Sequence, residues 1–261
     1  MIEVQSLVKK YRDFTAVSQV SLTVEPGELY VVLGPNGAGK TTTLKCVVGL
    51  LHPSGGRVLV GGHDVSREPE AAKSLVGYIP DRPFLYEKLT GAEFIRFMGR
   101  LYRTDPESLR KRAEDYLERF RLTGWENELI ESYSYGMRQK IVLAAVFARD
   151  PQVLVIDEPM VGLDPRAAKT LRELLQDLAE RGRTVVMSTH SVGLAEQMAT
   201  RIGIIDHGRV QAEGTMAELR ARTDASNNLE EVFLALTEQE EQERLAQSLG
   251  VGATAGGGGA G

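Results

Sequence analysis

The sequence contains a single cysteine and no long hydrophobic run. Cys46 has no second cysteine with which to form an intrachain disulfide, as is typical of proteins from a reducing compartment. The longest uninterrupted apolar run, IVLAAVFA, has eight residues, whereas a membrane-spanning helix needs about 18. The first residues, MIEVQSLVKKY, lack the hydrophobic core of a secretory signal. The sequence therefore predicts a cytosolic chain, although such a chain can still dock on a membrane protein.

An excess of positive charge and internal repeats are also lacking. The net charge is −5, so we expect no nucleic-acid partner. The sequence has no N/T-K-x-D motif of the kind that binds guanine, which argues against a GTPase. Apolar residues make up 42% and charged residues 26%, which is ordinary for a globular protein with a buried core.

The apolar pattern divides the chain into segments of different character. Ile2 and Val4, and again Val20, Leu22 and Val24, are apolar at every second position, as in strands with one buried face. The segment ELYVVLG, residues 28–34, predicts a buried strand. Helical spacing dominates from about 84 to 147. From 152 to 206, strand and helix patterns alternate, which predicts an α/β fold with a mostly parallel sheet covered by helices.

The last part of the sequence differs from the rest. Residues 227–237, NNLEEVFLALT, predict a short docking helix. Residues 238–261 are first acidic and then rich in glycine and alanine, and we expect them to be disordered. The predicted organisation is one domain over 1–237, with a helical insert at about 84–147, and a tail over 238–261.

A glycine-rich segment, GPNGAGKTT, follows the predicted strand LYVVL. It matches G-x-x-x-x-G-K-[ST] between a strand and a helix, the context that a phosphate-binding loop requires. Its glycines let backbone amides point toward phosphate groups, and the helix start adds a partial positive charge. We expect Lys40 to neutralise β- and γ-phosphate charge and Thr41 to bind Mg²⁺; the alternative is a glycine turn with a lysine by chance. The predicted nucleotide-binding residues here are Gly34, Pro35, Asn36, Gly37, Ala38, Gly39, Lys40, Thr41 and Thr42.

Three other predicted strands end in polar residues. VLVI runs into Asp157 and Glu158, TVVMST into His190, and LVGYI into Pro80 and Asp81. Ligands of open parallel sheets bind beyond the carboxyl ends of the strands, so these side chains are candidates for one site. We expect Asp157 to hold Mg²⁺ through water, Glu158 to polarise an attacking water and His190 to contact the γ-phosphate. The alternative is that they are ordinary polar strand ends.

Together these motifs resemble the ATPase subunit of an ATP-binding cassette (ABC) transporter over about residues 1–237. The Walker A loop GPNGAGKTT, the Walker B segment VLVIDEP, the D-loop GLDP and the switch histidine of STH occur in the family's order. Tyr11 matches the aromatic residue that stacks on adenine, although alone it is typical of an exposed strand end. The resemblance implies a phosphate-loop NTPase core with a mostly parallel sheet, an antiparallel β subdomain and a helical insert. It also implies ATP and Mg²⁺ as ligands.

The segment SYSYGMRQK lies where this family carries its signature, usually written LSGGQ. Ser134 and Gly136 match, whereas Tyr135 and Met137 replace a glycine and a glutamine. The resemblance implies that this helix start binds the γ-phosphate of ATP held by an opposite subunit, with the Tyr135 side chain pointing away. The variant is similar to those of bacterial exporters whose membrane subunits are separate chains.

Asp81 occupies the position where the family usually has a glutamine that touches Mg²⁺ and the attacking water. Aspartate is one methylene shorter and has no amide donor, but its carboxylate can still bind Mg²⁺. Two roles therefore stay open for Asp81: a Mg²⁺ ligand, or part of a hinge into the helical insert.

The resemblance implies a head-to-tail dimer in which Lys40, Glu158 and His190 act on ATP while Asp164 links the two sites. It further implies two kinds of partner: a second ATPase subunit and a polytopic membrane permease, at the cytoplasmic face of the cell membrane. Five apolar residues are candidates for the permease contact, or merely for packing of the insert: Phe84, Leu85, Tyr86, Phe94 and Phe97. The rival interpretation is a soluble ABC-type ATPase that acts on DNA or ribosomes, but such relatives usually carry two cassettes or long insertions.

Overall fold

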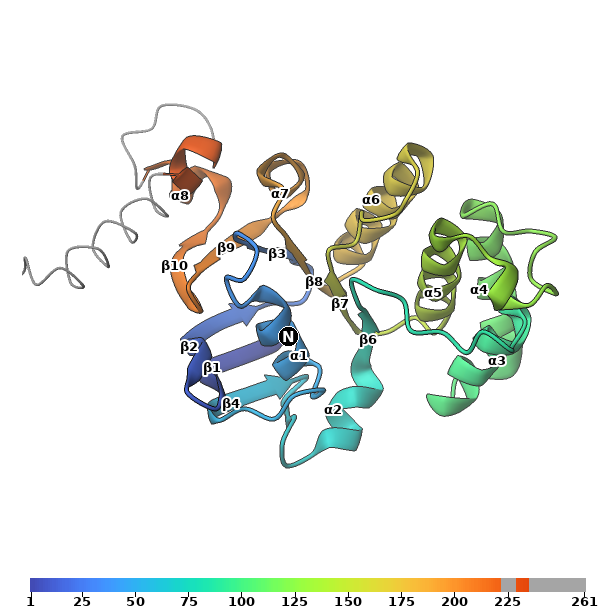
Figure 1. The fold of residues 1–261 in the computed structure, drawn as a ribbon, viewed down its shortest axis with the longest axis horizontal. Helices are drawn as coiled ribbons and strands as arrows, with labels where there is room; N and C mark the ends of the chain where they lie inside the picture. The colour runs from blue at the N-terminus through green and yellow to red at the C-terminus, as the bar shows by residue number, and fades with distance from the viewer. Residues whose placement is uncertain (222–228, 235–261) are drawn as a thin grey trace, which may run out of the picture.

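The computed structural model describes residues 1–221 and 229–234 (Figure 1). Its N-terminal part contains an antiparallel sheet with the strand order β2-β1-β4-β5. In β2 the buried residues Val20, Leu22 and Val24 alternate with exposed ones, as the sequence pattern predicts. The strands are β1 (Ile2–Tyr11), β2 (Phe14–Val24), β4 (Gly55–Val60) and β5 (His63–Asp64).

A second sheet forms the centre of the molecule, with the strand order β10-β9-β3-β8-β7-β6. Every pair from β9 to β6 is parallel, and only β10 runs antiparallel to its neighbour. The antiparallel edge strand β10 has no counterpart in the sequence prediction. The strands are β3 (Leu29–Leu33), β6 (Val76–Ile79), β7 (Val153–Asp157), β8 (Thr184–Thr189), β9 (Arg201–Asp206) and β10 (Arg209–Gly214).

The central sheet is buried on both faces, and successive residues of one strand belong to different cores. Tyr30 and Val32 of β3 pack in a core with β1, β2, β4 and α1 (Lys40–Val47). Leu29 and Leu33 pack in the other core, with α5 (Tyr135–Ala148). This core also contains residues from α6 (Pro165–Glu180) and α7 (Val192–Met198). Two-sided burial explains why the parallel strands read as continuous apolar runs rather than alternating ones.

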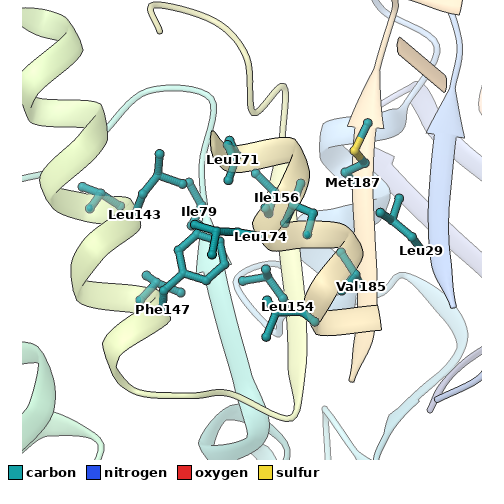
Figure 2. Packing of buried hydrophobic residues seen from close by; sticks show 14 of the residues in the cluster. Leu29, Ile79, Leu143, Phe147, Leu154, Ile156, Leu171, Leu174, Val185 and Met187 are labelled. Carbon is teal, nitrogen blue, oxygen red and sulfur yellow. The ribbon is translucent and has the colours of Figure 1, made fainter. Parts of the chain in front are cut away.

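Figure 2 shows how helices cover the second face. Leu143 and Phe147 of α5 lie beside Ile79 of β6, and Leu171 and Leu174 of α6 lie over Ile156 of β7. All are buried, with α5 exposing almost nothing over its last two turns. Burial of this kind stabilises the fold by about 1.5–3 kcal/mol per large side chain. The helix that begins at SYGM is therefore fixed against the same sheet that carries the phosphate loop.

The mainly helical segment lies at the opposite end of the molecule from β1, β2 and β4 (Figure 1). Thr90 and Glu93 form a capping box at the start of α3, and Asp105 caps α4. Phe94 is 4% exposed and packs in the core, so of its two predicted roles the structure supports packing of the insert and not a permease contact. The remaining elements are α2 (Pro69–Leu75), α3 (Gly91–Leu101), α4 (Pro106–Arg119) and the 3-10 helix η1 (Ile130–Ser132).

The described chain ends with α8 (Met216–Ala221) and a helical turn at residues 229–234. Leu229 and Val232 are fully buried and belong to the core that contains α7. The tail predicted over 238–261 lies outside the described residues. Within the described residues, no helix is long and apolar enough to span a bilayer.

Candidate nucleotide-binding site

The carboxyl ends of the parallel strands bring the predicted site residues to one edge of the central sheet. β3 leads into the phosphate loop, β7 ends at Asp157, and β8 is followed by His190. β8 lies between β3 and β7, so the three strand ends are neighbours. Placing these segments at one edge was the central structural prediction from the strand ends, and the strand order confirms it.

The phosphate loop depends on glycine where its backbone approaches other segments. A Cβ atom on Gly34 would lie 2.1 Å from the Ile205 carbonyl oxygen, and one on Gly39 would lie 2.6 Å from that of Ala16. Gly39 also has a φ of 101° and is the N-cap of α1, with no side chain bonded to the helix start. The first amides of α1 therefore have no acceptor from the helix or from a cap. Such a helix start binds anions, and phosphate in particular.

Lys40 is nearly buried in this loop. Its Nζ donates hydrogen bonds to the carbonyl oxygens of Gly34 at 2.8 Å and Pro35 at 3.0 Å, and lies 3.9 Å from Glu158 Oε1. Burial lowers the pKa of the Lys40 ammonium, and the carboxylates of Glu158 and Asp157 act in the opposite direction. The lysine charge is thus available at the loop, held by carbonyl groups that a phosphate oxygen can replace as partner.

Glu158 stands in a strained backbone conformation, with a φ of 48°. Its amide donates to the carbonyl oxygen of Ser188 at 3.2 Å, which holds this conformation in place. One carboxylate oxygen lies 2.9 Å from His190 Nδ1, and the other accepts a hydrogen bond from Thr189 Oγ1 at 3.4 Å. The carboxylate is 18% exposed. It is therefore oriented by its neighbours and still reachable by water, as a general base requires.

Asp157 is fully buried, and its two oxygens differ. Oδ1 accepts a hydrogen bond from Ser188 Oγ, whereas Oδ2 has no hydrogen-bond partner among the residues that the structure describes. A buried carboxylate oxygen without a partner is costly, so it marks a place for a cation or a cation-bound water. The described residues contain no cluster of three or more His, Cys, Asp or Glu side chains suited to a metal. One carboxylate with a threonine such as Thr41 nonetheless fits Mg²⁺, which keeps several waters and takes its other ligands from phosphates.

Tyr11 is the last residue of β1 and lies opposite Phe14 of β2. Tyr11 is 45% exposed, and Lys9 Nζ lies 5.3 Å from its ring centroid. An exposed aromatic face is suited to stacking on a base, and its role toward adenine stays a prediction.

Asp81 follows β6 at the same edge of the sheet, and its backbone carbonyl accepts a hydrogen bond from the Tyr135 hydroxyl at 3.3 Å. Tyr78 links this loop electrostatically to β7. Burial raises the pKa of the Tyr78 hydroxyl, and the carboxylates of Asp157 and Asp81 raise it further. The carboxylates of Asp81 and Asp157 thus both act on Tyr78. This is compatible with either predicted role of Asp81, as a Mg²⁺ ligand or as part of a hinge.

The signature turn begins α5 with a regular cap. Ser134 is the N-cap, and its Oγ accepts a hydrogen bond from the Met137 amide at 3.3 Å. Met137 packs against the core, which accounts for an apolar side chain at this position. The Met137 amide is thus already used, whereas helix geometry leaves the amides of Tyr135 and Gly136 without acceptors within the helix. Fewer amides of this turn can bind an anion than the four predicted residues, Ser134 to Met137, suggest.

Asp164 caps α6 and pairs with α5 in the same chain. Its Oδ1 accepts hydrogen bonds from the amides of Arg166 and Ala167, and its Oδ2 lies 2.5 Å from Lys140 Nζ. The hydrogen bond from Lys140, together with those from the two amides, lowers the pKa of Asp164 to about 2. A bond within one chain does not test the predicted role of Asp164 between subunits.

Comparison with known proteins settles the family. The model of the family described as ABC transporter matches residues 17–161, more than half of the chain. The chain belongs to the ABC transporter family. It is an ATP-binding subunit of that family, and its fold is the ABC ATPase fold that the sequence predicted.

The ABC ATPase chain resembles several curated proteins. It is 38% identical to the daunorubicin/doxorubicin resistance ATP-binding protein DrrA of Streptomyces peucetius, over 96% of this chain and 76% of DrrA. It is 34% identical to the ABC-type transporter ATP-binding protein EcsA of Bacillus subtilis (strain 168), over 92% of this chain and 98% of EcsA. Both relatives are named as ATP-binding proteins, in agreement with the phosphate loop.

Solved structures agree with the fold. A structure described as the ATP-binding subunit of an ABC transporter superposes with a TM-score of 0.87 and 32% identity, covering 91% of this chain and 99% of that one. The ATP-binding cassette MJ0796, described as dimeric and bound to ADP and Pi in a post-hydrolysis state, superposes with a TM-score of 0.75 and 25% identity, covering 83% and 99%.

Three residues that hold the predicted site residues were missed by the sequence analysis. Ser188 and Thr189 hold Asp157 and Glu158, and Lys140 holds Asp164. Ser188 and Thr189 directly precede His190, so their place at the end of a strand was a usable signal. Lys140 offered none, because its partner is 24 residues away and the fold alone brings the two together.

Proposed function

We propose that this chain hydrolyses ATP as one half of a head-to-tail dimer and powers export through a separate membrane permease. Residues 1–237 would form the ABC ATPase domain, on the cytoplasmic face of the cell membrane. The partners would be a second ATPase subunit, identical or homologous, and a polytopic permease.

One observation supports the proposed dimer. The phosphate loop and the signature turn are both built to bind an anion, yet they share no hydrogen bond or ion pair in the described residues. α1 lies near β1 and β4, whereas α5 lies with α3 and α4 toward the other end of the molecule (Figure 1). A second copy, turned head to tail, would supply the missing signature turn to each phosphate loop. The dimeric description of MJ0796 supports this arrangement.

In the proposed reaction Glu158 accepts a proton from water as the water attacks the γ-phosphate. His190, 2.9 Å from this carboxylate, orients it and contacts the phosphate. Lys40 and the amides of α1 and of the partner's signature turn stabilise the charge that develops on the phosphoryl oxygens. Mg²⁺, held by Thr41 and through water by Asp157, would neutralise phosphate charge, and Asp81 is a further candidate ligand.

Export is supported by the relatives, several of which are named for drug resistance or for Nod factor export. A permease contact is supported by exposed apolar side chains near Asp81. Phe84 is 89% exposed, and the rings of Tyr86 and Phe97 pack edge to face with centroids 5.2 Å apart. Exposed aromatic residues in a group mark interaction surfaces.

The proposal is tested by Ser134→Arg, with Ser74→Arg on the exposed face of α2 as the matched control. Ser134→Arg should abolish hydrolysis while ATP still binds to the chain, because the phosphate loop is untouched. Wild-type turnover in Ser134→Arg would contradict a signature that acts across subunits. Co-purification with a polytopic membrane protein would distinguish a transporter subunit from an ATPase with a non-membrane partner.

A further inference from the structure

Tyr135 in the signature turn contacts two loops that belong to the nucleotide-binding edge. A Cβ atom on Gly162 would lie 2.1 Å from Tyr135 Cε1, so the tyrosine ring lies directly against the D-loop backbone. The Tyr135 hydroxyl donates a hydrogen bond to the Asp81 carbonyl oxygen at 3.3 Å. One side chain thus touches the D-loop and the loop after β6 at the same time.

The contact with the D-loop is closely fitted. Gly162 has a φ of 79°, which favours glycine, and any side chain there would displace the ring. A Cβ atom on Gly136 would lie 3.0 Å from the Gly162 carbonyl oxygen. One turn further along α5, Lys140 pairs with Asp164. The start of α5 and the D-loop are therefore held together as one unit.

Core packing does not account for Tyr135. Tyr135 is 46% exposed, so its truncation opens no buried cavity. Its ring and hydroxyl are used for contacts with Gly162 and Asp81 instead. The hydroxyl reaches the residue that takes the place of the family's glutamine, at the edge where Asp157 and Glu158 also lie.

We propose that Tyr135 is a positioning residue that couples the two nucleotide sites of the dimer. It transmits a shift of the Asp81 loop, which belongs to the subunit's own site, to the signature turn and D-loop that face the partner's nucleotide. This inference rests on the dimer proposed above. It assigns no contact between Tyr135 and ATP.

Two substitutions distinguish the contribution of the Tyr135 hydroxyl from that of the Tyr135 ring. Tyr135→Phe keeps the ring against Gly162 and removes only the bond to Asp81, whereas Tyr135→Ala removes both contacts. The matched control is Tyr116→Phe, since Tyr116 lies on α4 and packs on Phe147, with ring centroids 5.4 Å apart. For each protein we would measure kcat, KM and the Hill coefficient for ATP, together with ATP affinity of the diluted monomer.

Tyr135→Phe should lower kcat several-fold and move the Hill coefficient toward one, with monomer affinity and urea midpoint as in wild type and in Tyr116→Phe. Tyr135→Ala should show the larger effect. A wild-type kcat and Hill coefficient in Tyr135→Phe would overturn the coupling role while leaving the dimer intact. A Hill coefficient of one in the wild type would also overturn the coupling, because the two sites would then act independently. The dimer itself would instead be contradicted by a Glu158→Gln chain that binds ATP and stays monomeric in light scattering.

Discussion

Lys140 Nζ lies 2.5 Å from Asp164 Oδ2, so the helix that begins at the signature turn is tied to the loop before α6. The two residues are 24 positions apart. Lys140 follows the signature turn, and Asp164 belongs to the D-loop. Asp164 serves as a helix cap at the same time. The position of the D-loop therefore depends on whether the Asp164 carboxylate is charged.

The first prediction concerns the pH dependence of this pair. The pKa of Asp164 is lowered from 3.8 to about 2. The charged carboxylate therefore contributes its full stabilisation of the folded state above pH 3.8, and this contribution disappears as the pH falls toward about 2. Asp164→Asn should keep the cap and lose the ion pair, with a cost of at most about 1 kcal/mol because the pair is partly exposed.

An NMR titration of the Asp164 carboxyl would check this, and its pKa should rise in Lys140→Met. Lys169→Met is the control, since Lys169 lies 3.8 Å from the exposed carboxylate of Glu173 and belongs to another helix, α6. An unchanged titration of Asp164 in Lys140→Met would show that the lysine does not set its pKa.

The second prediction separates capping from catalysis at Ser134. Ser134→Ala and Thr90→Ala each remove the side chain that caps a helix, of α5 and α3 respectively. Each should lower the free energy of unfolding by about 1 kcal/mol. Only Ser134→Ala should also lower ATPase activity, because only that helix start is proposed to bind phosphate. Equal ATPase activities in the two variants at matched stability would reduce Ser134 to a structural cap.

The third prediction concerns Mg²⁺. Asp157→Asn replaces the carboxylate whose Oδ2 has no hydrogen-bond partner in the described part of the chain, and it should raise the free Mg²⁺ needed for half-maximal hydrolysis by roughly 10- to 100-fold. ATP binding in the presence of EDTA should change little, since Lys40 and the amides of α1 remain. The measurement is ATPase activity against free Mg²⁺. A variant with the wild-type Mg²⁺ profile would show that Asp157 is only a structural strand end.

The fourth prediction tests stacking by Tyr11. Tyr11→Ala should weaken ATP binding by about 1–3 kcal/mol, the usual worth of stacking a base on an aromatic ring, whereas Tyr11→Phe should retain it. Binding of tripolyphosphate, which has no base, should be the same in all three proteins. Phe14→Ala removes the ring on the neighbouring strand and is the control. If Tyr11→Ala weakens the binding of tripolyphosphate as much as the binding of ATP, the tyrosine supports the phosphate loop and does not stack on the base.

The sequence alone was sufficient to predict the edge of the sheet on which the site lies. Buried parallel strands produce continuous apolar runs, and the polar residues that follow them must share one edge. Asp157, Glu158 and His190 were found in this way. The local signals were strong because each residue directly follows its strand.

Contacts between loops could not be predicted in the same way. The ring of Tyr135 lies on Gly162 because of how α5 and α6 pack on the sheet, which no local pattern encodes. Asp164 was expected to act between subunits, and its bond to Lys140 within the chain had no signal in the sequence. The role of Phe94 could not be decided from the sequence, because an apolar helix residue is equally suited to a core and to an interface until its face is known.

The dimer is the central claim, and the oligomeric state of Glu158→Gln tests it most directly. This change removes the proposed base, so hydrolysis should fall by about 10²- to 10⁴-fold while ATP binding persists. Light scattering after size exclusion with ATP and Mg²⁺ should then give twice the mass of one chain, and the mass should return to that of a monomer with ADP. A Glu158→Gln chain that binds ATP and remains a monomer at every protein concentration would contradict the account.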